Sequence, residues 1–285
     1  MNDLAPIRVA VLLVCHNRRE TTVRALRSLK HAPTHVQLLP VLFDDASSDG
    51  TAAAARAELP QTVIVQGDGS AFWNKGLFLA WQRAQELDPD AYLWLNDDVV
   101  LDADALERLF SAWGELSIEL SHRRFILVGS TRGSDGELTY SGLTARRALF
   151  AFRTSRVRPE SHLARVDTFN GNIVLVPREV VEEIGLNDPR YFHNLGDVDY
   201  GLRATRAGIE ARLVQGTVGV CELNEEKTLR GFAAPGLSWR ERWRKVNSHH
   251  GLPFKSWWRF TRKFSGPFLP FHFLVPYMRL LGLRR

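Results

Sequence analysis

The sequence predicts an α/β protein, with a doubly wound and mostly parallel sheet flanked by helices. Four apolar segments of strand length, each followed by a segment of helical periodicity, fill the first 113 residues. This alternation is typical of sheets that bind ligands at the carboxyl ends of their strands. Three of these strand ends carry acids or amides, namely Asn17, the pair Asp44 and Asp45, and the pair Asp97 and Asp98. We therefore expect a ligand site at this edge of the sheet.

The first unit sets the pattern for the other three. Residues 7–15 are apolar on both faces, as in a buried parallel strand, and a polar elbow leads from them into a helix with Val23, Leu26 and Leu29 on one side. The remaining units repeat this order. We expect further strands at 37–43, 62–66 and 91–95, and further helices at 51–59, 72–87 and about 103–113.

The strand at 91–95 ends in Asn96-Asp97-Asp98. Charges are costly in a protein interior, so a buried strand with acids at its tip is expected to end at the edge of a site. Carboxylate oxygens suit hard cations such as Mg²⁺ or Mn²⁺. The alternative is that the three residues form a turn before the next helix, since Asp and Asn favour turns.

The second half of the sequence is less regular. We expect strands at 125–129, 137–142 and 173–176, an irregular arginine-rich stretch at 143–167, and a helix from Pro177 to Gly185. A further helix begins near Asp197 and ends at Gly208. Asp197 and Asp199 lie in its first turn, where the helix dipole favours carboxylates, so they either stabilise the helix or line a site.

Several classes of protein are excluded. The two cysteines, Cys15 and Cys221, cannot form a disulfide framework and fit a reducing cytosol. The sequence contains neither G-x-G-x-x-G after the first strand nor a P-loop motif, so it predicts neither a dinucleotide-binding protein nor a P-loop NTPase. Strand tips that carry acids without a glycine cradle imply a metal ion that neutralises a diphosphate. No apolar segment reaches the length of a membrane-spanning helix.

The charge is unevenly distributed along the chain. Residues 227–285 hold 13 Lys and Arg against one acid, a net +12, whereas residues 1–226 hold 24 basic against 31 acidic residues, a net −7. Aromatic residues are interleaved with the positive charges of this tail. The tail could stack on single-stranded nucleic acid, dock on an anionic membrane, or pack against the acidic body.

Four motifs resemble those of the family 2 glycosyltransferases, which have the GT-A fold. The resemblance covers residues 7–222, and it depends on the order and spacing of the motifs because no single one is decisive. They are Cys15-His16-Asn17-Arg18, Asp44-Asp45-Ala46-Ser47-Ser48-Asp49-Gly50-Thr51, Asn96-Asp97-Asp98, and Gly196-Asp197-Val198-Asp199-Tyr200-Gly201-Leu202-Arg203. The GT-A fold is Rossmann-like, with a mixed, mostly parallel sheet.

The resemblance implies roles for the residues at the strand ends. In that family the first elbow and the Asp after the second strand hold nucleobase and ribose, the third motif corresponds to D-x-D, and the loop at 67–76 resembles one that touches the donor. A solvated helix lysine is the alternative for Lys75, and no histidine near 218–221 matches the extra metal ligand of many relatives. The implied donor-binding residues are Cys15, Asn17, Arg18, Asp44, Trp73, Lys75 and Asp97, and the implied metal ligands are Asp98 and Asn96.

The acidic pair before the C-terminal helix usually reads Glu-Asp in this family, with the Asp as the catalytic base. Here it reads Gly196-Asp197, so the resemblance implies Asp197 as the base and Asp199 as the second candidate. The implied reaction is a metal-dependent, inverting transfer from a nucleoside diphosphate sugar to a hydroxyl group. The donors expected from the resemblance are dTDP- or UDP-sugars.

The resemblance is to bacterial rhamnosyltransferase-like enzymes of surface polysaccharide synthesis, which implies a saccharide or lipid-linked saccharide acceptor. We expect a catalytic domain at 1–226, with a donor half at 1–115 and an acceptor half at 116–226. The basic, aromatic extension at 227–285 is then expected to bind the inner face of the cytoplasmic membrane rather than nucleic acid. The alternatives are a non-catalytic, membrane-peripheral protein of the same fold and a sugar nucleotidyltransferase.

Overall fold

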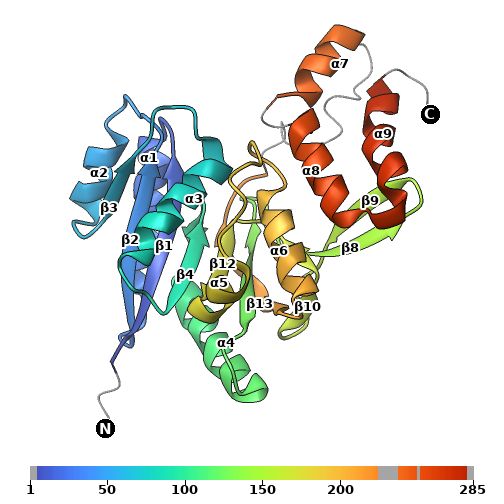
Figure 1. Cartoon of the computed structure of the whole chain (residues 1–285). Helices are drawn as coiled ribbons and strands as arrows, with labels where there is room; N and C mark the ends of the chain where they lie inside the picture. The colour runs from blue at the N-terminus through green and yellow to red at the C-terminus, as the bar shows by residue number, and fades with distance from the viewer. Residues whose placement is uncertain (1–4, 224–236, 249–250, 281–285) are drawn as a thin grey trace.

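The computed structural model describes residues 5–223, 237–248 and 251–280. In this part of the chain a large mixed sheet lies between two layers of helices, and helices of the C-terminal region pack beside it (Figure 1). The expected α/β architecture and helical extension are confirmed. None of the described helices is both long and apolar enough to cross a membrane.

The first half of the sheet consists of parallel strands in the order β3-β2-β1-β4. Cys15 lies opposite Asp44 in the register of β1 and β2, so the carboxyl ends of these strands meet at one edge of the sheet. The observed bounds of these elements agree with the predicted ones to within two residues, whereas the helix expected at about 103–113 extends to Leu120. The elements are β1 (Ile7–Cys15), α1 (Arg19–Ser28), β2 (Val36–Asp44), α2 (Thr51–Glu58), β3 (Val63–Gln66), α3 (Phe72–Gln85) and β4 (Ala91–Leu95).

The second half of the sheet mixes strand directions. β12 (Ile173–Pro177) runs antiparallel to β4 and to β6 (Phe125–Arg132), and β13 (Glu210–Val220) runs parallel to β6. The large sheet continues beyond β4 in the order β12-β6-β13-β10. The other elements of this half are β5 (Val100–Leu101), α4 (Ala105–Leu120), β7 (Leu138–Tyr140), β8 (Gly142–Ala148), β9 (Ala151–Arg156), β10 (Ala164–Val166), β11 (Thr168–Phe169), α5 (Arg178–Ile184) and α6 (Gly196–Arg206).

Two expectations for this half were wrong or incomplete. The stretch at 143–167, expected to be irregular, contains the antiparallel pair of β8 and β9, which forms a small sheet with β11. Most side chains of β9 face solvent, so the sequence lacks the alternation that marks a half-buried strand. Residues 210–220, for which no element was predicted, form the eleven-residue strand β13.

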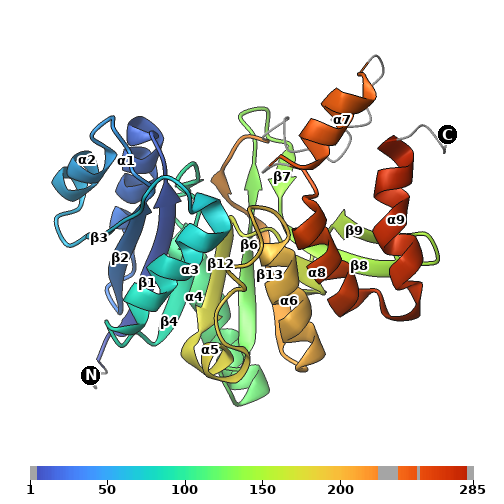
Figure 2. The same cartoon turned by 45° about the horizontal axis from the view of Figure 1, so that its top comes forward.

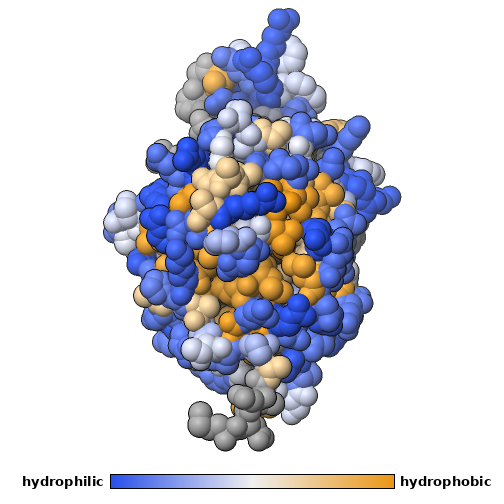
Figure 3. All heavy atoms as spheres, turned by 90° about the vertical axis from the view of Figure 1, so that its left-hand side faces the viewer, coloured by the Kyte–Doolittle hydropathy of each residue, from blue (hydrophilic) through white to orange (hydrophobic). Residues whose placement is uncertain are grey.

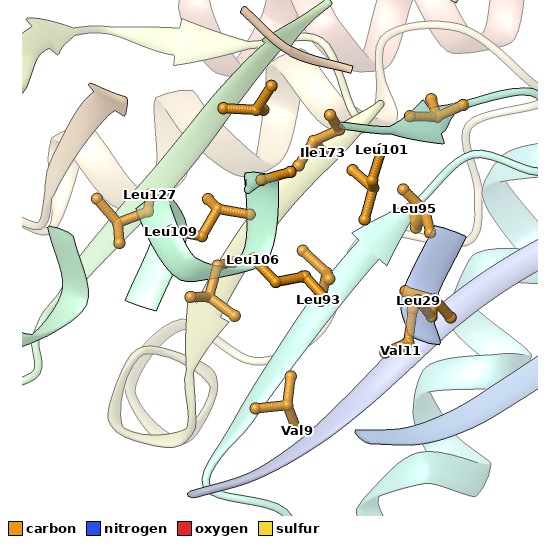
Figure 4. Packing of buried hydrophobic residues seen from close by; sticks show 14 of the residues in the cluster. Val9, Val11, Leu29, Leu93, Leu95, Leu101, Leu106, Leu109, Leu127 and Ile173 are labelled. Carbon is orange, nitrogen blue, oxygen red and sulfur yellow. The ribbon is translucent and has the colours of Figure 1, made fainter. Parts of the chain in front are cut away.

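Alternate residues of the buried strands supply two separate cores. In β1, Val9, Val11 and Leu13 face the side covered by α1, α2 and α4, where Leu106 and Leu109 pack against Leu93 and Leu127 (Figure 4). The intervening residues of β1 face α3, α5 and α6 on the other side. This two-sided burial explains why the strands read as continuous apolar runs.

β3 forms one edge of the large sheet, and Figure 3 views the molecule from that side. Hydrophobic residues cross the middle of this face, and hydrophilic residues surround them. Val63, Ile64 and Val65 of β3 are half-buried. The strand is only four residues long, and a short edge strand offers little backbone for pairing with another chain.

The C-terminal region forms α7 (Trp239–Val246), α8 (Phe254–Phe264) and α9 (Leu269–Leu280), and α9 packs against both α7 and α8 (Figures 1 and 2). A third apolar cluster joins Trp257, Phe260 and Phe264 of α8 to Tyr191 and Leu202 of the body. Packing on the body therefore accounts for part of the aromatic content of the tail. The expected domain boundary between residues 226 and 227 lies outside the described residues.

Candidate active site

The elbow after β1 and the acids after β4 meet at the edge of the sheet, as expected. The guanidinium of Arg18 lies 2.9 Å from Oδ2 of Asp98 and 3.3 Å from Oδ1 of Asp97. Burial acts to lower the pKa of Arg18, but the two carboxylates outweigh it and raise the pKa above its ordinary value. Arg18 is therefore a permanent cation that balances both acids, and its side chain is 40% exposed toward the site.

The rest of the elbow is fixed against the turn after β2. Asn17 has a left-handed backbone (φ 51°), and its Oδ1 accepts a hydrogen bond from the Ser48 amide at 2.8 Å. Oδ1 of the buried Asp44 accepts one from the Ser47 amide at 3.0 Å. Burial raises the pKa of the Cys15 thiol, and Asp44 and Asp97 raise it further, so Cys15 is a neutral wall of the site.

Asp45 is a structural residue that the sequence analysis did not select. Its Oδ1 accepts a hydrogen bond from the Gly69 amide at 2.9 Å, and its Oδ2 accepts from the amides of Ala71 and Phe72, both at 3.0 Å. One buried carboxylate thus holds the loop between β3 and α3. The sequence feature that could have identified this role of Asp45 is the pair Asp44-Asp45 at the end of a strand.

Trp73, at the start of α3, links the two halves of the site. Its Nε1 donates a hydrogen bond to Oδ1 of Asn96 at 2.8 Å. Its ring packs against Gly171, where a Cβ would lie 2.6 Å from the nearest ring carbon. Only glycine leaves room for the indole here, so residue 171 sets the distance between Trp73 and the loop that precedes β12.

Asp197 lies on the other side of Gly171. Its Oδ2 accepts a hydrogen bond from the Gly171 amide at 3.1 Å, and its Oδ1 accepts from the Val198 amide at 2.8 Å. Both oxygens are thus oriented by the backbone at the first turn of α6, and the residue is half-buried. The contacts from Asn96 through Trp73 and Gly171 to Asp197 bring residues a hundred positions apart into one site.

Asp199, the second candidate base, has a different environment. Its side chain is fully buried, and it accepts hydrogen bonds from the Tyr191 hydroxyl at 2.7 Å, from Nε of Arg203 at 3.0 Å and from Nζ of Lys263 at 2.7 Å. Lys263 belongs to α8 and also lies 3.1 Å from Asp188. Through these contacts Asp199 holds α6 against the C-terminal helix α8.

Asp98 has a neighbour that the sequence analysis missed. The thiol of Cys221, just after β13, lies 3.5 Å from Oδ1 of Asp98 and 3.6 Å from Nδ2 of Asn172. Within the described ranges, no three His, Cys, Asp or Glu side chains are grouped so that they could enclose a metal ion. Mg²⁺ commonly uses one or two carboxylates together with substrate phosphates, and the Asp98 side chain, 25% exposed, fits that type of site.

Lys75 lies apart from these residues, on the exposed face of α3. It lines a cavity of about 510 Å³ between the loop before α3, the loop before α6, and the C-terminal region. The cavity is lined by Ser70, Ala71, Lys75, Pro189, Arg190, Tyr191, Phe192, Asn247, Pro253, Phe254, Lys255 and Ser256.

Comparisons with known proteins identify relatives of the chain. Residues 6–248 match the model of a family described as "Glycosyltransferase like family 2". No curated protein sequence matches. Residues 1–349 of TarS from S. aureus have a similar structure, with a TM-score of 0.55 and 14% identity over 91% of this chain and 72% of that one. TarS was also solved with UDP and with UDP-GlcNAc.

A second similar structure is the mannosyltransferase PcManGT from Pyrobaculum calidifontis, solved with GDP-Man and Mn²⁺. Its TM-score is 0.52, with 18% identity over 98% of this chain and 76% of that one. At these identities the likeness shows the fold alone.

Proposed function

Because the chain belongs to glycosyltransferase family 2, we propose that it transfers a sugar with inversion from a dTDP- or UDP-sugar to a hydroxyl group of a saccharide or lipid-linked saccharide. The GT-A fold expected from the sequence is confirmed by the similar structures. Rhamnose as the sugar and bacterial surface polysaccharide synthesis as the pathway remain predictions. One observation carries the proposal: Trp73 and Gly171 join Asn96, beside Asp98, to Asp197 across a single site.

In this proposal Asp197 is the catalytic base. Its carboxylate removes the proton of the acceptor hydroxyl while that oxygen forms a bond to the anomeric carbon. The bond from that carbon to the diphosphate breaks at the same time, and the nucleoside diphosphate leaves with the electron pair. The two backbone amides that orient Asp197 support this role, because a base must be held in position before the substrate arrives. The buried Asp199 supports the position of α6.

The donor is expected to lie along the strand ends. Cys15, Asn17 and Asp44 form the nucleoside side of the crevice, and Arg18 and Asp97 lie where the diphosphate would extend toward Trp73. A guanidinium suits this place, since it stays charged and can form paired hydrogen bonds with phosphate oxygens. The contact of Arg18 with Asp97 and Asp98 would then loosen as the donor binds.

Asp98 is the main candidate ligand for Mg²⁺ or Mn²⁺, with Asn96 beside it. The amide oxygen of Asn96 already accepts the Trp73 hydrogen bond, so Asn96 would orient the indole as well as face the cation. When bound, such a cation stabilises the charge of the departing diphosphate. The carboxylate of Asp98 and the diphosphate together supply the oxygen ligands that these hard cations prefer.

We expect a dTDP- or UDP-sugar to raise the melting temperature, and Mn²⁺ to increase the shift. A ligand at a hundred times its Kd adds about 2.7 kcal/mol to the free energy of unfolding. For a domain of this size that is a shift of roughly 5–10 °C. The measurement is a thermal-shift panel of nucleoside diphosphate sugars with and without Mn²⁺.

The matched variants for this panel are Asp98→Asn and Asp88→Asn. Asp98→Asn should lose the part of the shift that depends on Mn²⁺. Asp88 precedes the amino end of β4, whereas the site lies at the carboxyl ends of the strands. Its side chain is 76% exposed, and Asp88→Asn should respond to the ligands as the wild type does. Flat responses of the wild type to every nucleotide sugar would contradict the proposal and favour a non-catalytic protein of the same fold.

The C-terminal helices support a second part of the proposal, binding to the inner face of the cytoplasmic membrane. Trp239 is 63% exposed, Trp243 49% and Trp258 42%. Further apolar side chains of α8 and α9 are exposed, namely Phe254, Phe271, Leu274 and Met278. Exposed Arg240, Arg244 and Lys245 follow the tryptophans of α7. Exposed aromatic and basic residues on neighbouring helices suit the interface of an anionic membrane.

We expect the protein to float with vesicles of phosphatidylglycerol and phosphatidylcholine, and to do so less at high salt because salt screens the charges. The triple variant Trp239→Ser, Trp243→Ser and Trp258→Ser should lower the affinity for the vesicles at least tenfold, because a tenfold loss needs only about 1.4 kcal/mol and each buried indole contributes up to about 2 kcal/mol. Ile118→Ser on α4, at an 82% exposed residue away from the C-terminal helices, is the control. Equal flotation of the triple variant and the wild type would show that these tryptophans do not bind the membrane.

A further inference from the structure

The cavity beside α3 carries positive charge, and the loops that form it also support the candidate reaction centre. None of the twelve described residues that line it is acidic, and three are basic: Lys75, Arg190 and Lys255. Each comes from a different part of the chain, α3, the loop before α6, and α8. A pocket that gathers cations from three segments has an electrostatic preference for an anion.

The three cations are balanced to different degrees. Arg190 is paired with Asp188 through two hydrogen bonds, of 2.8 Å and 2.9 Å. Lys75 interacts electrostatically with the exposed Asp68 and lowers the pKa of that carboxyl group, after the larger effect of Ser70. Among the described residues, no carboxylate lies within ion-pair distance of Lys255. Lys255 therefore retains most of its capacity to bind a ligand anion.

Aromatic rings form the other part of the lining. Phe192 is 43% exposed and stacks at a tilt on Phe72, with 4.7 Å between ring centroids. Phe254 is 52% exposed and contacts Phe273 edge to face. Both rings line the pocket together with the three cations, so the pocket fits a ligand with a charged group next to an apolar chain.

The loops that form the pocket also form the reaction centre. The Ala71 amide is held by Asp45, and the Asn74 side chain donates hydrogen bonds to the carbonyl oxygens of Asp188 and Tyr191. Gly196 packs so tightly on Asn74 that a Cβ there would collide with the amide oxygen. Asp197 follows directly in the chain, so the pocket and the candidate base are held by the same packed loops.

We propose that this pocket binds the phosphate or diphosphate of a lipid-linked acceptor, with the lipid chain against Phe192 and Phe254. This inference rests on the proposed function, because it identifies the class of acceptor for the same site. A sugar attached to the bound phosphate extends toward Asp197, and the lipid chain leaves along α8 toward the exposed aromatic surface of the C-terminal helices. The donor diphosphate is the competing source of phosphate, and its expected place is beside Arg18 at the strand ends.

The test is a calorimetric titration of the full chain with geranyl diphosphate, geraniol and inorganic diphosphate. We expect geranyl diphosphate to bind more tightly than either fragment, and its affinity to fall with ionic strength. Lys255→Gln should weaken its binding about tenfold, the usual effect of losing one charge-assisted hydrogen bond, and Lys255→Arg should restore most of it. Arg262→Gln removes the same charge from an exposed position of α8 outside the pocket and should bind as the wild type does.

Two arms separate the possible outcomes. A saturating nucleoside diphosphate should leave the binding of geranyl diphosphate unchanged. Competition between the two ligands would mean that the cations of the pocket bind the donor diphosphate, and it would overturn the proposal. Equal binding of geraniol and geranyl diphosphate, or equal losses in Lys255→Gln and Arg262→Gln, would also overturn it. The titration needs no transfer reaction, so binding of geranyl diphosphate by a protein that ignores every nucleotide sugar would refute the proposed function alone.

Discussion

Asp197→Asn is expected to lower kcat by about 10²–10⁴-fold and to leave donor affinity unchanged, because a positioned general base contributes a factor of that size. Asparagine has nearly the same shape but cannot accept the proton of the acceptor hydroxyl. The asparagine side chain has only one oxygen, so it can accept a hydrogen bond from only one of the Gly171 and Val198 amides. Its NH₂ group is a donor and would lie against the other backbone N–H, which is also a donor.

The measurement is the rate of sugar transfer at saturating donor, together with donor affinity and the unfolding curve of the same variant. Asp167→Asn is the matched control, since Oδ2 of Asp167 accepts the Ala145 amide at 2.7 Å and the residue lies outside the site. It should lose a similar amount of stability and retain its activity. Transfer by Asp197→Asn at the wild-type rate would show that another group removes the proton.

Lys263→Met should lower the free energy of unfolding by about 2–4 kcal/mol. Removing one partner of a buried ion pair typically costs about 3–5 kcal/mol. The lower range applies because Lys263 is 27% exposed and because Arg203 and Arg190 still face Asp199 and Asp188. Lys263 contacts both carboxylates from α8, whereas Arg259 of the same helix reaches only Asp188, at 3.9 Å, so the variant should also loosen α8 from the loop that precedes Asp197.

Urea unfolding at several pH values checks this expectation. Burial acts to raise the pKa of Asp188, but hydrogen bonds from Arg190 and Lys263 outweigh it and hold that pKa below its ordinary value. The stability that depends on the charged Asp188 is therefore present above about pH 4 and is lost as the pH falls further. The difference between wild type and variant should shrink in the same direction.

Two variants control for the position and for the charge of Lys263. Lys263→Arg keeps the positive charge and should retain most of the stability. Arg262→Met changes the exposed neighbour on the same helix and should stay within about 0.5 kcal/mol of the wild type. A loss in Lys263→Met no larger than that in Arg262→Met would mean that the buried carboxylates are satisfied without the lysine.

The first half of the fold could be predicted because its information is local. Apolar runs mark buried strands such as β1 and β4, and the helices between them show their periodicity within one or two turns. The pair of β8 and β9 escaped prediction because its stability comes from pairing with each other and with β11, while its side chains are largely exposed arginines and threonines. Pairing between distant segments leaves little trace in a single sequence.

The candidate site shows the same division between local and distant information. Asn17, Asp44 and Asp98 could be selected because parallel strands bring their carboxyl ends together. The partners of these residues come from elsewhere in the chain: Cys221 reaches Asp98 from the end of β13, and Lys263 reaches Asp199 from α8. Without the tertiary contacts, Asp197 and Asp199 are equivalent acids two positions apart, and only burial distinguishes them.

Helix α8 has a consequence for how this enzyme could diversify. Within eleven residues it carries Lys255 on the cavity, Trp258 on the exposed aromatic surface, and Lys263 in the buried charge network. A substitution that adapts one of these surfaces shifts a helix on which the other two depend. Under the proposed function, a change of acceptor is coupled to membrane attachment and to stability, and new specificities would evolve through paired substitutions in α8 and the loop before α6.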